Sequence, residues 1–381
     1  MKPLLSSLRQ LWPRGSVSLL PQIRPEGFVG KHRSATLNHA YHTKGDNTRA
    51  TERYPMPNKK DLPHDIIEYL EEAEVTNGFL PNVFKVMANR PEEFRVFFAY
   101  HDIVMHRKTG KLSMADKELI ALVVSTVNHT PYCVTVHSAS HRKHSKKPTL
   151  ADKLCPLSVS GNLWGRSQSV ALNHPQSSEG ENITKEIGRY PLPKKTDLPY
   201  DIVELMEEIE VKTGFLPNVF KAMAHRPAEF RAFFAYYNAI MNKEAGNLSK
   251  ADKELIIVAT SIVNKCPYCV IAHGALHRIY SKKPALADQV AVNWKLADLS
   301  DREMAMLDFA LAVCRADNIT EEHFQKLEAH GFDREDAWDI GSISAFFAMS
   351  NRLAHVIDLH PNPEFYIMGR IPREKNSISS Q

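Results

Sequence analysis

A long segment of this chain occurs twice, and the two copies align without a gap. The first copy begins at Arg53-Tyr54-Pro55 and the second at Arg189-Tyr190-Pro191, so corresponding residues lie 136 positions apart. The copies match at most positions through Asp152 and Asp288. Self-similarity of this length is typical of a duplicated domain rather than of a solenoid of short repeats. We therefore expect one arrangement of secondary structure to be built twice.

The two copies differ in length. The second continues beyond Asp288, whereas the first stops after Lys153. The segment that follows contains Ser and Gly and shows no hydrophobic periodicity, which is typical of a linker. The expected organisation is a leader at 1–44, a truncated copy at 45–154, a linker at 155–188, a complete domain at 189–373 and a disordered tail at 374–381. The alternative is that duplicated exons, normally spliced as alternatives, are joined in one gene model.

Hydrophobic periodicity predicts helices in both copies. Asp61-Leu62-Pro63 marks the start of one helix and Arg90-Pro91 the start of another, with a break at Gly78 between them. Ser113 and Asp116 have the spacing of a capping box before a long apolar helix. The second copy repeats these signals and adds three helices, at 301–315, 320–330 and 334–359. No alternation of period two persists, so the predicted fold class is all-α.

Composition limits the function classes that remain. The 381 residues are enough for two domains of ordinary size. With 43% hydrophobic and 24% charged residues the composition is that of a globular protein, and no apolar run is long enough to cross a membrane. The net charge of +4 is too small to indicate a nucleic acid partner. Five cysteines, an odd number, favour a compartment in which most thiols stay free.

The first 44 residues have a composition of their own. They contain several Lys and Arg residues but a single acidic residue, Glu26. Apolar side chains can share one face of a short helix here, namely Leu4, Leu5, Leu8, Leu11 and Trp12. An amphipathic, acid-poor and Arg-containing leader is typical of a mitochondrial transit peptide. We therefore expect a mitochondrial protein; the alternative is a disordered tail on a cytoplasmic one.

One acidic residue of the second copy stands among apolar side chains. Glu254 is followed directly by Leu255, and apolar residues continue to Ala259. Burial of a carboxylate favours its protonated form and suits it to proton transfer. The alternative is a surface glutamate that pairs with Lys250 or Lys253.

A pair of cysteines follows twelve residues later, in Cys266-Pro267-Tyr268-Cys269. Proline is tolerated at the first helical position, so we expect Cys266 to cap a new helix and Cys269 to lie in its first turn. Free amide groups at a helix start stabilise a thiolate at either sulfur. His273 then lies on the same face as Cys269, within reach as a proton acceptor, and His277 lies one turn further on.

The same residues are also potential zinc ligands. Cys266, Cys269, His273 and His277 would supply two thiolates and two imidazoles. A structural zinc usually gathers ligand pairs from two elements, whereas these four lie on one short helix and would surround a tetrahedral ion poorly. We therefore expect no metal at this site.

The spacing of Glu254, the cysteine pair and His273 resembles the alkylhydroperoxidase D (AhpD-like) fold within the carboxymuconolactone decarboxylase superfamily. The resemblance is to the peroxidase-related branch in particular. It covers 189 to about 370 in full and 53 to 154 in part. The motifs that carry it are Gly214–Asn218, Phe233–Tyr237, Cys266–His273, Leu286–Asp288, Phe346–Arg352 and Pro361–Tyr366.

The resemblance implies a homo-oligomeric thiol peroxidase that needs no metal, haem or other cofactor. It implies that Cys269 attacks a hydroperoxide and that Cys266 resolves the product as a disulfide. Glu254 and His273 would relay protons, and a thiol or dithiol donor of unknown identity would reduce the disulfide. One departure from the family pattern is Tyr268, which stands where the best-known relay of the family has a histidine. Tyrosine cannot act as a base near neutral pH, so it does not replace that histidine in the relay. Tyr268 and His277 are therefore expected to give supporting contacts only.

The first copy keeps Glu118, Cys133 and His137, but Thr130 replaces its first cysteine. Such a site can form a sulfenic acid but needs an external thiol to complete a cycle. This copy also lacks the three C-terminal helices, so apolar helix faces would stay exposed unless another surface covers them. We therefore expect a degenerate, non-catalytic module. Cys314 is expected in the core and Cys155 to be incidental.

These observations predict an enzyme, a dithiol peroxidase that acts on hydroperoxides. One alternative is a non-enzymatic redox-sensing or scaffold protein, which would use the truncated copy to bind partners. Another is a lyase resembling carboxymuconolactone decarboxylase, but such members of the superfamily generally lack the vicinal thiols present here.

Overall fold

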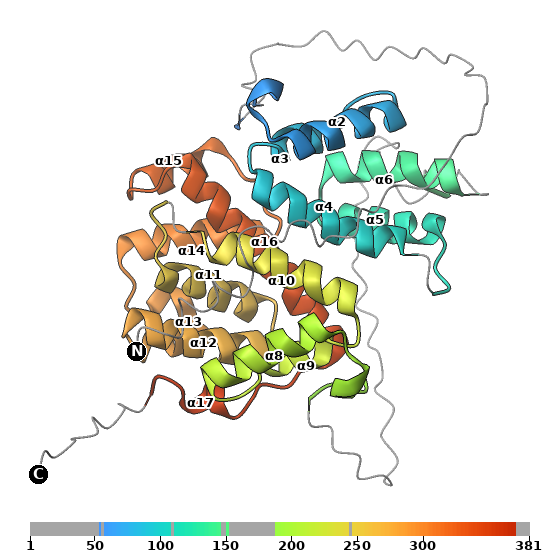
Figure 1. The fold of residues 1–381 in the computed structure, drawn as a ribbon. Coiled ribbons are helices and arrows are strands. Elements are labelled where there is room, and N and C mark those ends of the chain that lie inside the picture. Colours follow the sequence, from blue (N-terminus) through green and yellow to red (C-terminus); the bar gives the residue numbers. More distant parts are fainter. Residues whose placement is uncertain are drawn as a thin grey trace, which may run out of the picture. The chain divides into compact units, whose positions relative to one another are not determined.

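The computed structural model describes residues 53–54, 57–107, 110–145, 150–151, 187–243 and 246–370. The expected leader, nearly all of the expected linker, and the last residues of the chain lie outside these ranges. Helices and connecting loops make up the described residues, and none of them forms a strand (Figure 1). The predicted all-α fold is therefore confirmed. No helix of the described part is long and apolar enough to cross a membrane.

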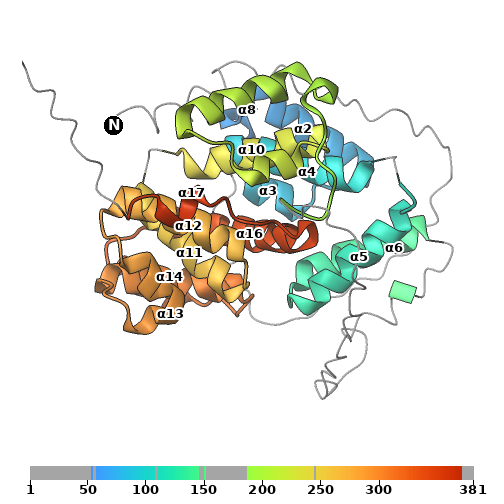
Figure 2. The same ribbon diagram turned by 90° about the horizontal axis from the view of Figure 1, so that it is seen from below.

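The repeat in the sequence is a repeat in the structure. The first copy consists of η2 (Lys59–Asp61), α2 (His64–Asn77), α3 (Asn82–Met87), α4 (Pro91–His106), α5 (Met114–Val127) and α6 (Pro131–His144). The second repeats them in order as η4 (Lys195–Asp197), α8 (Tyr200–Thr213), α9 (Asn218–Met223), α10 (Pro227–Met241), α11 (Lys250–Val263) and α12 (Pro267–Ser281). The long helices of each copy pair as neighbours, α5 with α6 (Figure 1) and α11 with α12 (Figure 2).

The second copy continues with helices that have no counterpart among the described residues of the first. They are α13 (Leu286–Asn293), η5 (Trp294–Leu296), α14 (Asp301–Cys314), α15 (Glu321–Glu328), α16 (Arg334–Ile357) and α17 (Glu364–Ile367). The three predicted helices correspond to α14, α15 and α16, with ends that differ from the prediction by two residues or fewer. The sequence analysis did not predict α13 and α17.

Local sequence explains where the repeated helices begin and end. α2 and α8 each end at a glycine with positive φ, Gly78 at 78° and Gly214 at 85°, a conformation that glycine adopts at no steric cost. α5 and α11 each begin with the predicted capping box, in which the serine side chain accepts from the backbone of the aspartate and the aspartate from the serine. These ends fix the register of α11 and hence the position of Glu254 along it.

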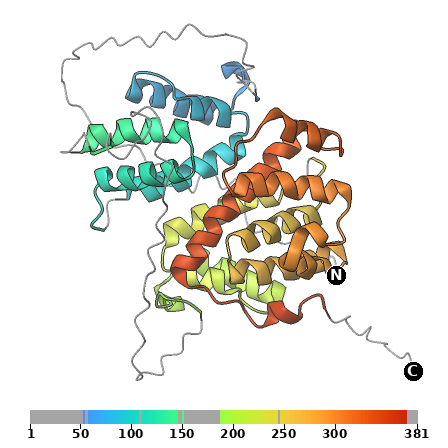
Figure 3. The same cartoon turned by 180° about the vertical axis from the view of Figure 1, so that it is seen from behind.

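α11 is the central helix of the second copy. Its residues from Asp252 to Ser261 are all buried, and it packs against α12, α13, α14 and α16. The long α16, coloured red, crosses the domain beside α14 and α11 (Figure 3). A helix that is apolar nearly all round requires such cover on several sides. The C-terminal helices therefore complete the core that the repeated segment begins.

In the first copy, apolar side chains of α5 that correspond to buried ones of α11 are exposed. Ile120, Val123 and Val124 on α5 are exposed, and Ile120 retains 52% of its accessible surface. The corresponding Ile256 is 0% exposed on α11, a helix that packs against α13, α14 and α16 as well as α12. The exposed face agrees with the expectation for a copy that lacks the C-terminal half.

Candidate functional site

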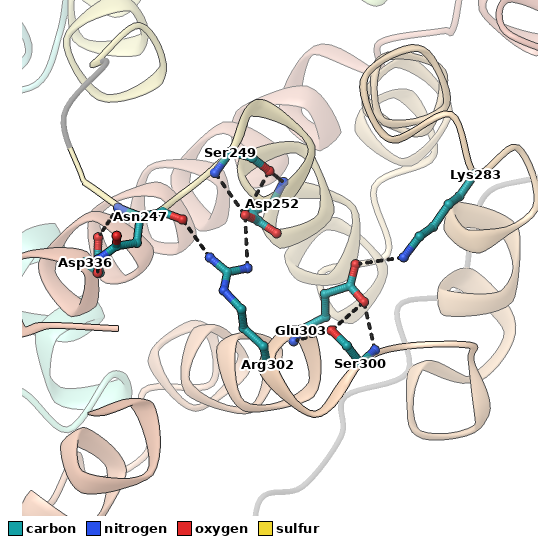
Figure 4. Close-up of polar contacts among 8 residues, drawn as sticks. All are labelled: Asn247, Ser249, Asp252, Lys283, Ser300, Arg302, Glu303 and Asp336. Atoms are coloured by element: carbon teal, nitrogen blue, oxygen red, sulfur yellow. Dashed lines mark hydrogen bonds and ion pairs between the residues drawn. The ribbon is translucent and has the colours of Figure 1, made fainter. Parts of the chain in front are cut away.

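The start of α11 is bonded to α14 and α16, two helices without a counterpart in the described part of the first copy. At the capping box of Ser249 and Asp252, Arg302 of α14 donates to the Asp252 carboxylate at 3.2 Å and to the carbonyl of Asn247 at 2.6 Å (Figure 4). Asn247 in turn donates to both carboxylate oxygens of Asp336 on α16, at 2.8 Å from its backbone and 2.7 Å from its side chain. This network holds α11 in place at one end.

Glu254 lies one turn along α11 and meets His273 of α12. Its carboxylate Oε2 is 2.7 Å from Nδ1 of His273. Glu254 is 3% exposed and His273 is 9% exposed. Lys253, the alternative partner considered from the sequence, instead donates to the backbone carbonyls at the end of α10, which are those of Ile240, Met241 and Lys243. The structure therefore favours the buried, His-paired glutamate over the surface one.

Aromatic rings enclose this pair. The ring of Phe347 on α16 packs edge-on against His273, with centroids 4.8 Å apart. Burial, with the neighbouring charge of Glu254, raises the pKa of Tyr237 and that of Tyr280 above their ordinary range. An ionised Glu254 accepts from Nδ1–H of His273, which leaves Nε2 of the ring as a proton acceptor. Exclusion of water strengthens such interactions.

The cysteine pair occupies the predicted position at the start of α12. Cys266 is the N-cap residue, Cys269 lies in the first turn, and both are free thiols with 1% and 3% exposure. A hydrogen bond from Cys269 lowers the pKa of Cys266 to about 6, against the opposing effect of burial. The shared proton and burial raise the pKa of Cys269. The pair is thus arranged to hold one proton, with the negative charge on Cys266.

Tyr268 and His277 make contacts away from the Glu254–His273 pair. The Tyr268 hydroxyl accepts from the backbone N–H of Val219 at 3.3 Å, at the start of α9. His277 is buried, and burial lowers its pKa to about 4, which keeps the ring neutral. Its Nδ1 is 3.5 Å from the Ser281 hydroxyl.

The charged residues nearest to His277 form a cluster of their own. Lys283 donates to Glu303 at 3.3 Å, and Glu303 forms the capping box of α14 with Ser300 (Figure 4). Both Lys283 and Glu303 act on the titration of His277, in opposite directions. Lys283 follows the C-cap of α12, so its ion pair with Glu303 links the segment after α12 to the start of α14.

The first copy assembles part of the same arrangement. Glu118 Oε2 lies 2.8 Å from Nδ1 of His137. Cys133 is half-buried, and burial raises the pKa of its thiol, with a smaller opposing effect of Ser125. At the N-cap of α6 the Thr130 hydroxyl donates to the carbonyl of Asn128 at 3.2 Å. The carboxylate–imidazole pair is present, but the second sulfur is missing.

Sequence reasoning missed three groups that surround the site. Tyr237 and Phe347 stand in segments noted only as motifs, and Asn351 on α16 was not considered as a site residue. A fully buried asparagine must find hydrogen-bond partners, so its burial would have been the signal, but burial is not visible in a single sequence.

Within the described part of the chain, no group of three or more His, Cys, Asp or Glu residues is arranged to hold a metal ion.

Comparisons with known proteins match both copies. The model of the carboxymuconolactone decarboxylase family matches residues 91–152 and 227–284, which are corresponding parts of the two copies. A crystal structure described as an alkylhydroperoxidase AhpD core, an uncharacterized peroxidase-related protein from Ralstonia eutropha, is 56% identical over 98% of that chain and 49% of this one, with a TM-score of 0.48. An uncharacterized peroxidase-related protein from Silicibacter is 38% identical over 100% of that chain and 50% of this one, with a TM-score of 0.47. No curated protein matches the chain.

Proposed function

The chain belongs to the carboxymuconolactone decarboxylase family, among its AhpD-like members, and from this premise we propose that its second copy is a thiol peroxidase. The proposed substrates are hydrogen peroxide and organic hydroperoxides. The proposed reductant is a thiol or dithiol compound that converts the oxidised site back to two thiols. The two similar crystal structures, described as an alkylhydroperoxidase core and as peroxidase-related proteins, support this substrate class.

One observation carries the proposal: two sulfurs and a proton-transferring pair meet on the neighbouring helices α11 and α12. Cys266 and Cys269 share a proton, so one of them is ready to react as a thiolate near neutral pH. His273 follows Cys269 by one helical turn and is held by Glu254 at 2.7 Å. This combination supplies a nucleophile, a resolving thiol and a proton donor within one buried site.

The proposed cycle balances in three steps. The thiolate attacks the distal peroxide oxygen and the O–O bond breaks, so the sulfur becomes a sulfenic acid and the other oxygen leaves as alkoxide, which takes the proton that Nε2 of His273 accepted when the thiolate formed. The second cysteine then attacks the sulfenic sulfur, the S–O bond breaks, and water leaves from the Cys266–Cys269 disulfide. Finally, an external dithiol gives two electrons to that disulfide and becomes oxidised itself.

We propose that the first copy does not complete this cycle. Cys133 has the carboxylate–imidazole pair of Glu118 and His137 nearby, but Thr130 stands where the resolving sulfur would be. A hydroxyl cannot form a disulfide. The first copy therefore provides an internal control in which the same groups exist without the second thiol.

The test is single-turnover consumption of cumene hydroperoxide by the reduced full-length protein. Trypsin cleaves after Lys265 and Arg278 and releases one peptide with both cysteines, so their disulfide appears as the loss of two hydrogen atoms by mass spectrometry. We expect wild type to form it and Cys266→Ser and Cys269→Ser to fail. Cys133→Ser should behave as wild type. A wild-type protein that consumes no hydroperoxide and keeps both thiols would end the proposal.

Matched substitutions in the two copies test the proton relay. Glu254→Gln leaves His273 without a carboxylate, and loss of general acid–base catalysis typically slows a reaction about 10²- to 10⁴-fold. The corresponding Glu118→Gln in the first copy should leave the single-turnover rate unchanged. Equal slowing by both variants would place the relay elsewhere.

A further inference from the structure

α16 brings an uncharged polar side chain to the turn between α11 and α12. Asn351 is 0% exposed, although its neighbour in sequence, Arg352, is exposed. A buried carboxamide has two N–H donors and one oxygen acceptor, and each must be satisfied to avoid a cost in stability. The partners of Asn351 therefore reveal what the side chain does.

The orientation of this carboxamide is fixed by its neighbours. Its Oδ1 accepts from Nδ2 of Asn264 at 3.0 Å, so the two N–H groups must point to the other side. One of them donates to the hydroxyl of Ser261 at 3.0 Å. The backbone carbonyl of the same Ser261 accepts from the backbone N–H of Cys266 at 2.9 Å. Asn351 is thus bonded to the turn on which Cys266 stands.

The same side chain reaches both sulfurs. Asn351 makes a polar contact with Cys266 and with Cys269, and in each case the contact favours the thiolate. Ser350, the residue before it, contributes likewise at Cys269. An N–H donor stabilises a negatively charged sulfur more than a neutral one, because hydrogen bonds to charged acceptors are the stronger kind.

Two other ionisable groups, His355 and Tyr268, interact electrostatically with the cysteine pair. His355, also on α16, lies with its Nε2 2.8 Å from the carbonyl of Asn264 and favours the Cys266 thiolate when it is charged. The charges of Cys266 and Cys269 raise the pKa of Tyr268, after the larger effect of burial, so that tyrosine stays neutral. Asn351 differs from both because it carries no charge that changes with pH.

We propose that Asn351 is a positioning residue of the cysteine pair, whose clamped carboxamide directs its second N–H toward the sulfurs and so selects the thiolate form of the reduced site. The inference rests on the proposed function for its biological meaning, but the effect on the thiols is independent of any substrate. The proposed role of Asn351 also distinguishes the two copies, since the first has no counterpart of α16 within the described residues. Its cysteine then lacks an α16 donor as well as a second sulfur.

The test is the pH profile of alkylation by iodoacetamide on the reduced full-length protein, measured on the tryptic peptide 266–278. For wild type we expect half-maximal alkylation near pH 6, the pKa of Cys266. Asn351→Asp keeps the size and the acceptor toward Asn264 but replaces the N–H donors by a negative charge, so loss of the hydrogen bond and repulsion of the thiolate should together raise the midpoint by about one pH unit or more. Asn351→Ala should shift it in the same direction.

Ser344→Ala is the matched control on the same helix. Ser344 is fully buried and donates to the carbonyl of Ala310 at 2.7 Å, so its loss perturbs the packing of α16. Its alkylation midpoint should match wild type. Unchanged midpoints in both Asn351 variants, or an equal shift in Ser344→Ala, would overturn the inference.

Two further results keep the inference separate from folding and from the proposed function. If Asn351→Asp does not fold, Asn264→Ala releases the carboxamide from its fixed orientation and should raise the midpoint by a smaller amount; no rise there counts against the inference. A protein whose thiols shift as described but that consumes no hydroperoxide would refute the peroxidase proposal and leave the role of Asn351 intact.

Discussion

At the scale of single residues, the start of α12 makes two neighbouring cysteines chemically different. Cys266 precedes the first helical residue, where backbone N–H groups without helical partners favour negative charge. The hydrogen bond from Cys269 adds to this effect and places the pKa of Cys266 at about 6. The family resemblance assigns the attack on peroxide to Cys269, whereas this charge distribution favours Cys266. The two assignments make opposite predictions.

Substitution of Cys269 separates the causes of this low pKa. Cys269→Ala removes the hydrogen-bond donor, so the pKa of Cys266 should rise toward its ordinary value of 9.0. Cys269→Ser keeps an O–H donor in the same place and should leave the pKa near 6. Because the thiolate is lost as pH falls through the pKa, alkylation of Cys266 should decline below about pH 6 in Cys269→Ser and already below about pH 9 in Cys269→Ala.

Either of two results would contradict this account. Identical alkylation profiles for Cys269→Ala and Cys269→Ser would mean that the hydrogen bond does not set the pKa. Alkylation of Cys269 ahead of Cys266 in the wild-type protein, between pH 6 and pH 9, would support the roles that the resemblance implies.

The sequence predicted the residues of this site where they lie on adjoining helices. Helical spacing placed Cys269 and His273 on one face, and the resemblance linked Glu254 to His273; the two side chains lie 2.7 Å apart. Their catalytic roles stay a prediction. Asn351 could not be found in this way, because it comes from α16, far along the chain, and only the packing of α16 on α11 brings it to the cysteines.

At the scale of helices, one sequence pattern gives a buried helix in the second copy and a half-exposed one in the first. The predicted helices are those with a strong start signal, such as the capping boxes of α5, α11 and α14. α13 begins after Ala285 without a side-chain cap, and α17 has four residues, too few to show a periodicity. Their formation depends on the helices that they pack against, α11 and α12.

The difference in burial predicts unequal effects of the same substitution in the two copies. Ile256→Ala removes a side chain that is 0% exposed between packed helices, so the free energy of unfolding should fall by about 2–5 kcal/mol. Ile120→Ala removes the corresponding side chain from an exposed face and should change it by no more than about 0.5 kcal/mol. Urea titration followed by circular dichroism reports on the helices of both copies, and tryptophan fluorescence adds a probe of the second copy through Trp294 and Trp338.

A large loss of stability in Ile120→Ala would show that the exposed face of α5 is covered in the protein in solution. Val292→Ala is a suitable control within the second copy, because Val292 lies on α13 with 89% of its surface exposed. It should behave as Ile120→Ala does. A fall of several kcal/mol there would mean that burial does not explain the difference between the copies.

At the scale of the whole molecule, the contacts that define the site all lie within the second copy. The Glu254–His273 pair, the two cysteines and the clamp of Asn351 come from α11, α12 and α16. The network that holds the start of α11 joins it to α14 and α16. Duplication alone would predict two equivalent sites, whereas the structure completes the surroundings of one.

This arrangement predicts that the second copy carries the chemistry without the first. A fragment of residues 189–381 contains every helix from α8 to α17, so it should form the Cys266–Cys269 disulfide with hydroperoxide at the rate of the full chain. A fragment of residues 1–154 retains Glu118, His137 and a single cysteine, Cys133, so peroxide should give a sulfenic acid and no intramolecular disulfide. Mass spectrometry of both fragments after peroxide treatment makes the comparison. The contradicting outcome is a fragment of residues 189–381 that folds, as judged by circular dichroism, yet reacts more slowly than the full chain. That result would mean that the first copy acts on the site, and that its retained carboxylate–imidazole pair has a role beyond structure.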